Sequence, residues 1–198
     1  MSTLAAPAFR SAAASAPSWQ AAMGSVLQSL GTPDPAHNLG FVYVTDFHAN
    51  DLDDILIFLR QTTGIAKWVG SVGIGVVGSG VEYYDRPAIS VLLAALPADG
   101  FTLFADAKRL PHDVGLDSAA PVLLVHADPQ IPDLQEVLAD LARRSDGFLI
   151  GGLSASRGAD RQVAGGVHSG SLSGVAIALE GQPMATALSQ GCAPIGPT

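Results

Sequence analysis

The sequence repeats one pattern of apolar residues twice, at an interval of 82 positions. In each copy the apolar residues follow the i, i+3, i+4, i+7 spacing that predicts an amphipathic helix. The first copy is Leu52, Ile55, Leu56 and Leu59, and the second is Leu134, Val137, Leu138 and Leu141. A chain built on two such segments is constrained to a fold with two similar halves.

Apolar runs flank each predicted helix and predict strands. The runs are 41–44, 68–70 and 88–96 around the first helix, and 122–125, 149–151 and 172–179 around the second. Two unrelated strand–helix units would share part of this pattern, but here all the segments keep one order and nearly one spacing. We therefore predict an α+β (mixed α/β) fold. Two duplicated βαβ-β modules, residues 40–98 and 120–180, form mixed sheets with the helices packed outside.

The N-terminal part of the chain does not belong to this repeat. Residues 1–17 are rich in Ala and Ser and contain Pro7 and Pro17, so we expect a loose leader and not a signal peptide. Ser18 can cap a helix that begins at Trp19 and ends before Gly31. Residues 18–198 are then expected to form a single domain.

Composition narrows the possible partners and the compartment. Ten basic and 18 acidic residues give a net charge of −8, and no cluster of Lys or Arg occurs. Nucleic acids and anionic membranes are therefore not expected as partners. Cys192 is the only cysteine, which excludes an intramolecular disulfide and favours a cytoplasmic location. The composition leaves the oligomeric state open.

The sequence lacks the common catalytic and metal-binding motifs. The G-x-S-x-G elbow and the phosphate-binding P-loop are absent, and no two histidines are spaced for one metal on a helix, so no metal site is expected. Two hypotheses remain open beside a binding function. One is a haem held by His168 or His126, and the other is an enzyme with Cys192 as nucleophile and one of these histidines as base.

Three stretches combine glycines with polar side chains, as binding sites for small polar ligands often do. They cover residues 78–82, 151–157 and 189–196. The candidate ligand-binding residues are Glu82, Gly151, Gly152, Ser154, Ser156, Arg157, Gln190, Gly191 and Cys192. The amides, hydroxyls and guanidinium of the second stretch suit a carboxylate. The alternatives are a polar turn for the second stretch, and a tail that fills a groove for the third.

These stretches also resemble a known family. The segments that carry the likeness are 69–78, 80–82, 87–91, 151–156, 174–176 and, most specifically, 189–197. They resemble the N-terminal domain of the FIST sensory family, and the likeness extends from Phe9 to the C-terminus. Many relatives have Arg where Ala193 stands here, so any anion contact made by that Arg is not expected in this chain.

The resemblance implies a function in signalling, not in catalysis. FIST domains occur in bacterial signalling proteins, and the likeness implies a cytoplasmic sensory domain that binds a small molecule, with amino acids as candidate ligands. It also implies a FIST C-terminal domain, a signalling kinase or a cyclase as partner. Relatives that resemble haem-dependent gas sensors make haem an alternative, and a pure protein-interaction domain is a further one.

Overall fold

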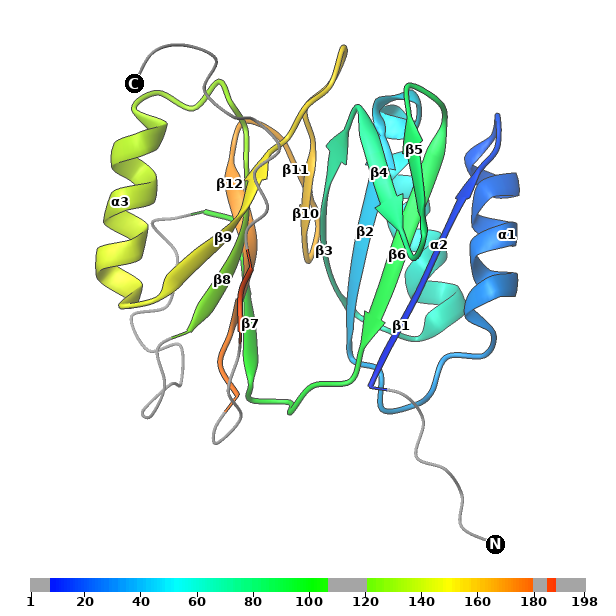
Figure 1. Cartoon of the computed structure of the whole chain (residues 1–198), viewed down its shortest axis with the longest axis horizontal. Helices are drawn as coiled ribbons and strands as arrows, with labels where there is room; N and C mark the ends of the chain where they lie inside the picture. Colours follow the sequence, from blue (N-terminus) through cyan, green and yellow to red (C-terminus); the bar gives the residue numbers. More distant parts are fainter. Residues whose placement is uncertain (1–7, 107–120, 180–184, 188–198) are drawn as a thin grey trace, which may run out of the picture.

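Two β-sheets lie face to face, and helices cover their outer faces. The computed structural model describes residues 8–106, 121–179 and 185–187. Within these residues the chain has three α-helices and twelve strands, which confirms the predicted α+β class. Figure 1 shows the order of the layers, with α3 on the outside of one sheet and α1 and α2 on the outside of the other. The helices therefore pack outside, as the sequence predicts.

The first sheet has six strands in the order β1-β6-β2-β3-β10-β11. Its strands are β1 (Phe9–Ser15), β2 (Leu39–Thr45), β3 (Lys67–Gly73), β6 (Ala88–Ala94), β10 (Gln162–Ala164) and β11 (Val167–His168). β2 and β3 are parallel, and the chain between them forms the 3₁₀ helix η1 (Asp46–Asp51) and α2 (Leu52–Thr63). All other pairs in this sheet are antiparallel.

The second sheet has four strands in the order β7-β12-β8-β9. They are β7 (Phe101–Phe104), β8 (Val122–Ala127), β9 (Phe148–Leu153) and β12 (Leu172–Ile177), with α3 (Leu134–Ser145) between the parallel strands β8 and β9. This order and these pairing directions match those of β1-β6-β2-β3. The match agrees with two similar modules, while their origin by duplication stays a prediction.

Two hairpins lie outside the repeated set of four strands. The β10–β11 hairpin follows β9 in the chain, yet β10 pairs with β3 and so extends the first sheet. The hairpin of β4 (Gly75–Gly78) and β5 (Val81–Tyr84) forms a separate two-stranded sheet. It packs beside β6, where the Ser90 hydroxyl donates to the Val77 carbonyl over 2.8 Å.

All three predicted helices are present, and each packs its apolar face against a sheet. Helix α1 (Trp19–Leu30) begins at Ser18, whose hydroxyl accepts a hydrogen bond from the Ala21 amide over 3.3 Å. Helix α2 buries the four residues of the first repeated pattern and ends at Gly64, which has a φ of 75°. Helix α3 packs on the second sheet through Leu141, which is fully buried.

The expectation of a loose leader is wrong for residues 9–15. These residues form β1 and pair with β6 along its whole length, from Phe9 with Ala94 to Ser15 with Ala88. The Arg10 guanidinium also donates to the carbonyls of Leu30, the last residue of α1, and of Thr32 just after it. Ala and Ser have little intrinsic preference for strands, so a local reading misses a strand that is stabilised by a partner distant in the sequence.

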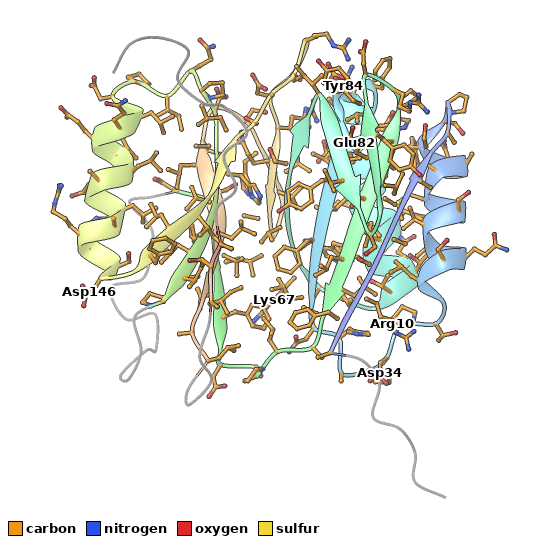
Figure 2. The ribbon with its side chains drawn as sticks, viewed as in Figure 1. Arg10, Asp34, Lys67, Glu82, Tyr84 and Asp146 are labelled. Atoms are coloured by element: carbon orange, nitrogen blue, oxygen red, sulfur yellow. The ribbon has the colours of Figure 1, made fainter. Side chains whose placement is uncertain are left out.

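The space between the sheets is largely apolar. Its buried core includes Leu39, Val69, Ala94, Phe101 and Val175. Figure 2 labels the exposed Lys67 at the lower end of this layer, where its ammonium lies 4.4 Å from the centre of the Phe101 ring. None of the helices among the described residues is long and apolar enough to cross a membrane.

Candidate functional site

Polar side chains from both sheets face each other in one part of this apolar layer. Ser90, Tyr43, Ser71 and Gln162 occupy paired positions on neighbouring strands of the first sheet, so they share one face. On the second sheet, Ser173 is paired with His126. Buried polar groups are costly unless they are hydrogen-bonded, so two facing polar rows are the most unusual feature of the core.

Tyr43 and His126 connect the two rows. The Tyr43 hydroxyl lies 3.1 Å from Nε2 of His126, and the two rings meet edge to face at 71°. Burial raises the pKa of Tyr43 to about 12 and lowers the pKa of His126 to about 4. At neutral pH the phenol is therefore protonated and the imidazole is neutral.

Two buried polar atoms next to this pair lack a hydrogen-bond partner among the described residues. They are Nδ1 of His126 and the hydroxyl of Ser173. Nearly all buried polar groups in proteins are satisfied by protein atoms, water or a ligand. Both atoms are buried, so the polar rows contain two hydrogen-bonding groups without a partner among the described residues.

A hollow of about 390 Å³ lies beside the Tyr43–His126 pair. Its lining is made of Tyr43, Ser71, Leu124 and His126, together with residues 72–73 and 75–77 of the first half and 151–153 of β9. No lining side chain carries a charge at neutral pH. Gly151 has a φ of +134°, and a Cβ there would lie 2.0 Å from the Val125 carbonyl oxygen, so β9 can approach β8 only with glycine at this position.

A hydrogen-bonded group beside the hollow links the two sheets. The Gln162 side chain is fully buried, donates to the Ser154 hydroxyl over 2.8 Å and accepts from Ser171. Ser154 in turn donates to the Ala127 carbonyl of β8 over 3.2 Å. The hydroxyl of Ser154, which the sequence predicts to bind ligand, is therefore engaged in a contact between the sheets.

Arg157 holds the connection from β9 to β10 at one end of the hollow. Its guanidinium donates to both carboxylate oxygens of Asp46, over 2.7 and 2.9 Å, and to the carboxylate of Asp85. These hydrogen bonds lower the pKa of Asp46. The guanidinium also lies 5.1 Å from the centre of the Phe47 ring. A carboxylate ligand would have to displace one of these acidic partners to bind Arg157.

The other predicted residues lie in different places. Gly152 lines the hollow, whereas Ser156 accepts a hydrogen bond from the Gly158 amide within the connecting turn. Glu82 is exposed on β5 and does not line the hollow (Figure 2). His168, on β11, lies 3.3 Å from the Ala164 carbonyl through its Nε2. Gln190, Gly191 and Cys192 lie outside the described residues.

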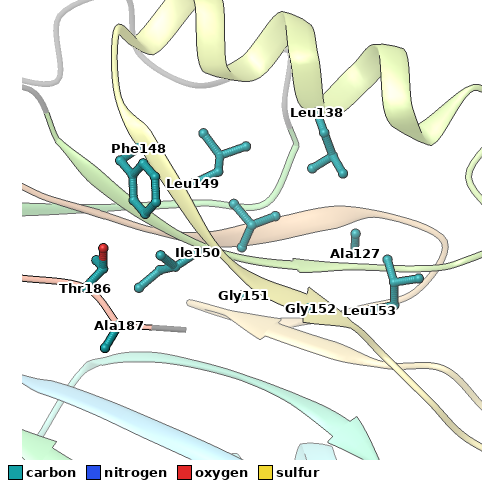
Figure 3. A pocket seen from close by; sticks show the side chains of 11 residues that line it. Ala127, Leu138, Phe148, Leu149, Ile150, Gly151, Gly152, Leu153, Thr186 and Ala187 are labelled. Carbon is teal, nitrogen blue, oxygen red and sulfur yellow. The ribbon is translucent and has the colours of Figure 1, made fainter. Parts of the chain in front are cut away.

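A second, apolar hollow of about 620 Å³ adjoins the first along β9 (Figure 3). Its walls include Leu138 of α3, Phe148 and Ile150 of β9, and Thr186 and Ala187 near the C-terminus. Both hollows are lined by residues 151–153 and meet at β9, with Val125, Ala127 and Leu138 on the α3 side of the sheet and Leu124 and His126 on the other side. The two hollows together are called the groove below, the first being its polar end and the second its apolar end.

Comparison with models of known protein families gives a match. The model of the FIST N domain matches residues 38–198, which include the second sheet, every strand of the first sheet except β1, and the lining of both hollows. The chain belongs to the FIST N domain family. FIST domains are sensory domains of signal transduction. No curated protein and no solved structure is significantly similar to the chain.

Four polar residues of this FIST N domain were not predicted from its sequence: Tyr43, Ser71, Gln162 and Ser173. A signal for them exists, because each stands inside or next to a run that is otherwise apolar. A polar residue inside a strand indicates a site only when it is known which face of the sheet the side chain is on. The repeat pattern does not reveal which face of one sheet packs against the other sheet.

The described residues of this FIST N domain do not fit a haem or a metal ion in their present arrangement. Nε2 of His126 is bound to Tyr43, its Nδ1 is buried, and polar side chains surround the ring. His168 lies beside the Ala164 carbonyl through its Nε2. No group of three or more potential metal ligands occurs in the part of the chain that the structure describes.

Proposed function

We propose that this FIST N domain senses a small, polar, uncharged or zwitterionic metabolite, which binds between the sheets at the Tyr43–His126 pair. The observation that carries the proposal is the hollow of about 390 Å³, whose lining brings together Tyr43, Ser71 and His126. Binding sites for small molecules are commonly apolar hollows with a few polar groups that orient the ligand.

The electrostatics of the lining favour a ligand without net charge. Tyr43 and His126 are both neutral at neutral pH, and Arg157, which follows the lining residues 151–153 in the chain, already has carboxylate partners. Amino acids remain candidates because their two charges cancel, and a carboxylate could replace Asp85 or Asp46 at Arg157. A fully anionic ligand would find no unpaired positive charge among the lining residues.

A thermal-shift screen of amino acids, other polar metabolites and haemin tests the proposal. A ligand present at one hundred times its Kd stabilises the folded state by about 2.7 kcal/mol. If no compound raises the melting temperature, the domain is better explained as a protein-interaction module. A Soret band after addition of haemin would favour the haem alternative instead.

A matched pair of variants locates the site once a ligand is found. Tyr43→Phe removes one hydroxyl from the hollow, while Tyr84→Phe removes a hydroxyl from an exposed tyrosine outside it. We expect Tyr43→Phe to weaken the calorimetric affinity about five- to tenfold and Tyr84→Phe to leave it unchanged, since one neutral hydrogen bond contributes about 1 kcal/mol. Equal affinities of the two variants would show that the ligand does not bind at Tyr43.

A further inference from the structure

Tyr43 and His126 occupy corresponding places in the two sheets. Their strands, β2 and β8, have the same position in the orders β1-β6-β2-β3 and β7-β12-β8-β9. Tyr43 is paired with Ser90 of β6, and His126 is paired with Ser173 of β12, so a serine stands beside each ring on the corresponding strand. The contact between Tyr43 and His126 therefore joins matching points of two similar sheets.

The next strands, β3 and β9, are also in the same register. Gly70 of β3 is paired with Val42, and Gly151 of β9 is paired with Val125. A Cβ at Gly70 would clash with the carbonyl oxygen of Val42, and a Cβ at Gly151 would clash with that of Val125. Because both glycines permit the same close approach, they are corresponding residues, and so are the residues that follow them.

The residue after this glycine differs between the two strands, being Ser71 in β3 and Gly152 in β9. Ser71 is paired with Tyr43 and Gly152 with His126, so both lie on the faces that meet between the sheets. Both also line the polar hollow of about 390 Å³. The two sheets therefore differ on the wall of this hollow, where one has a side chain and the other has none.

A side chain at position 152 would enter the polar hollow. No heavy atom of the described residues lies within 4 Å of a Cβ placed on Gly152, and its φ is outside the range that favours glycine. Because side chains alternate along a strand, residue 152 faces the same side as His126, whereas residues 151 and 153 face the side of α3. Neither the backbone nor the packing among the described residues requires glycine at 152.

We propose that Gly152 determines the size of the ligand that the polar hollow admits. This inference rests on the proposed function, because it concerns the same hollow. The missing side chain leaves room beside Ser71 for a ligand to reach the Tyr43–His126 pair, and a side chain at 152 takes up part of that room. Gly152 is therefore a specificity-determining residue whose effect grows with the size of the ligand.

Thiol labelling tests this size limit without the natural ligand. Ser71→Cys places a thiol in the polar hollow, and Cys192→Ser removes the only native one. The protein is treated with methyl methanethiosulfonate or with the larger benzyl methanethiosulfonate, and mass spectrometry follows both rates. Gly24→Val is the control for Gly152→Val, because Gly24 also has open space at its Cβ but lies on α1, outside the first sheet.

Gly152→Val should slow the benzyl reagent about tenfold or more relative to the methyl reagent, because the added side chain fills space that the larger reagent needs. Gly152→Ser, which introduces the residue found at the corresponding place in β3, should slow it less and provides a smaller change if the valine disturbs folding. Gly24→Val should leave the ratio of the two rates unchanged.

Equal ratios in the Gly152 variants and in Gly24→Val would overturn the proposal. A thiol at position 71 that neither reagent modifies when residue 152 is glycine would also overturn it, since the hollow would then not admit a molecule of ligand size. These failures are distinct from failure of the proposed function, which occurs when no metabolite raises the melting temperature.

Discussion

The neutral imidazole at the centre of the polar rows makes the stability of the fold depend on pH. Burial lowers the pKa of His126 to about 4, whereas an unfolded histidine titrates near 6.5. Between these values the unfolded chain binds more protons than the folded one, so acidification favours unfolding. The stability contributed by the neutral imidazole is present above pH 6.5 and is lost as the pH falls toward 4.

The shift in the pKa of His126 determines how much the free energy of unfolding changes with pH. Each unit of pKa difference corresponds to about 1.4 kcal/mol, so the free energy of unfolding should fall by about 3 kcal/mol between pH 7 and pH 4 because of His126. Urea denaturation of the wild type and of His126→Gln, measured at several pH values, isolates this contribution. The glutamine keeps a polar group near Tyr43 but does not titrate.

The informative quantity is the difference in the free energy of unfolding between the wild type and His126→Gln. His48 also has a pKa lowered by burial, and acidic groups titrate in both proteins, so these effects cancel in the comparison. The stability advantage of the wild type over His126→Gln should shrink by about 3 kcal/mol on going from pH 7 to pH 4. Curves that stay parallel over this range would show that the imidazole is not buried between the sheets.

Two further predictions concern the groove and its end. Gly151→Ala should lower the free energy of unfolding by at least about 2 kcal/mol, because its Cβ would meet the Val125 carbonyl, whereas Gly152→Ala, with open space around it, should change it by less than about 0.5 kcal/mol. Equal melting temperatures of the two variants would contradict the close approach of β9 to β8. Arg157→Ala should speed hydrogen exchange in residues 154–161 at least as much as Asp46→Asn, because it removes the ion pairs with both Asp46 and Asp85, and Asp46→Asn should have a smaller effect in the Arg157→Ala background than alone. Unchanged exchange in Asp46→Asn would mean that Arg157 is held by other groups.

The helices and most long strands could be predicted from the sequence because their signals are local. The spacing of Leu52, Ile55, Leu56 and Leu59 marks the buried face of α2, and Ser18 marks the beginning of α1. The strands that were missed or misjudged are short or poor in β-branched residues. β1 and β10 are strands because they pair with β6 and β3, which are far away in the sequence, and β11 forms by pairing with β10.

The candidate site could be predicted only in part for a similar reason. Gly151 and Gly152, which the sequence names as candidate ligand-binding residues, line the hollow together with His126, which the sequence names only as a candidate haem ligand or base. The roles of Ser154 and Arg157 depend on partners more than 25 positions away, Ala127 and Asp46, which no local pattern reveals. The polar rows likewise form only when two sheets face each other.

The crossing of the β10–β11 hairpin from one half to the other has a consequence for folding. Since β10 completes the sheet of the first half, a fragment that contains the first half alone would leave the outer amides of β3 without their partner. The two halves should therefore not behave as independently folding units, and their unfolding should occur in a single transition. Their contacts join segments distant along the chain, so refolding should be slow compared with that of helical proteins of similar length.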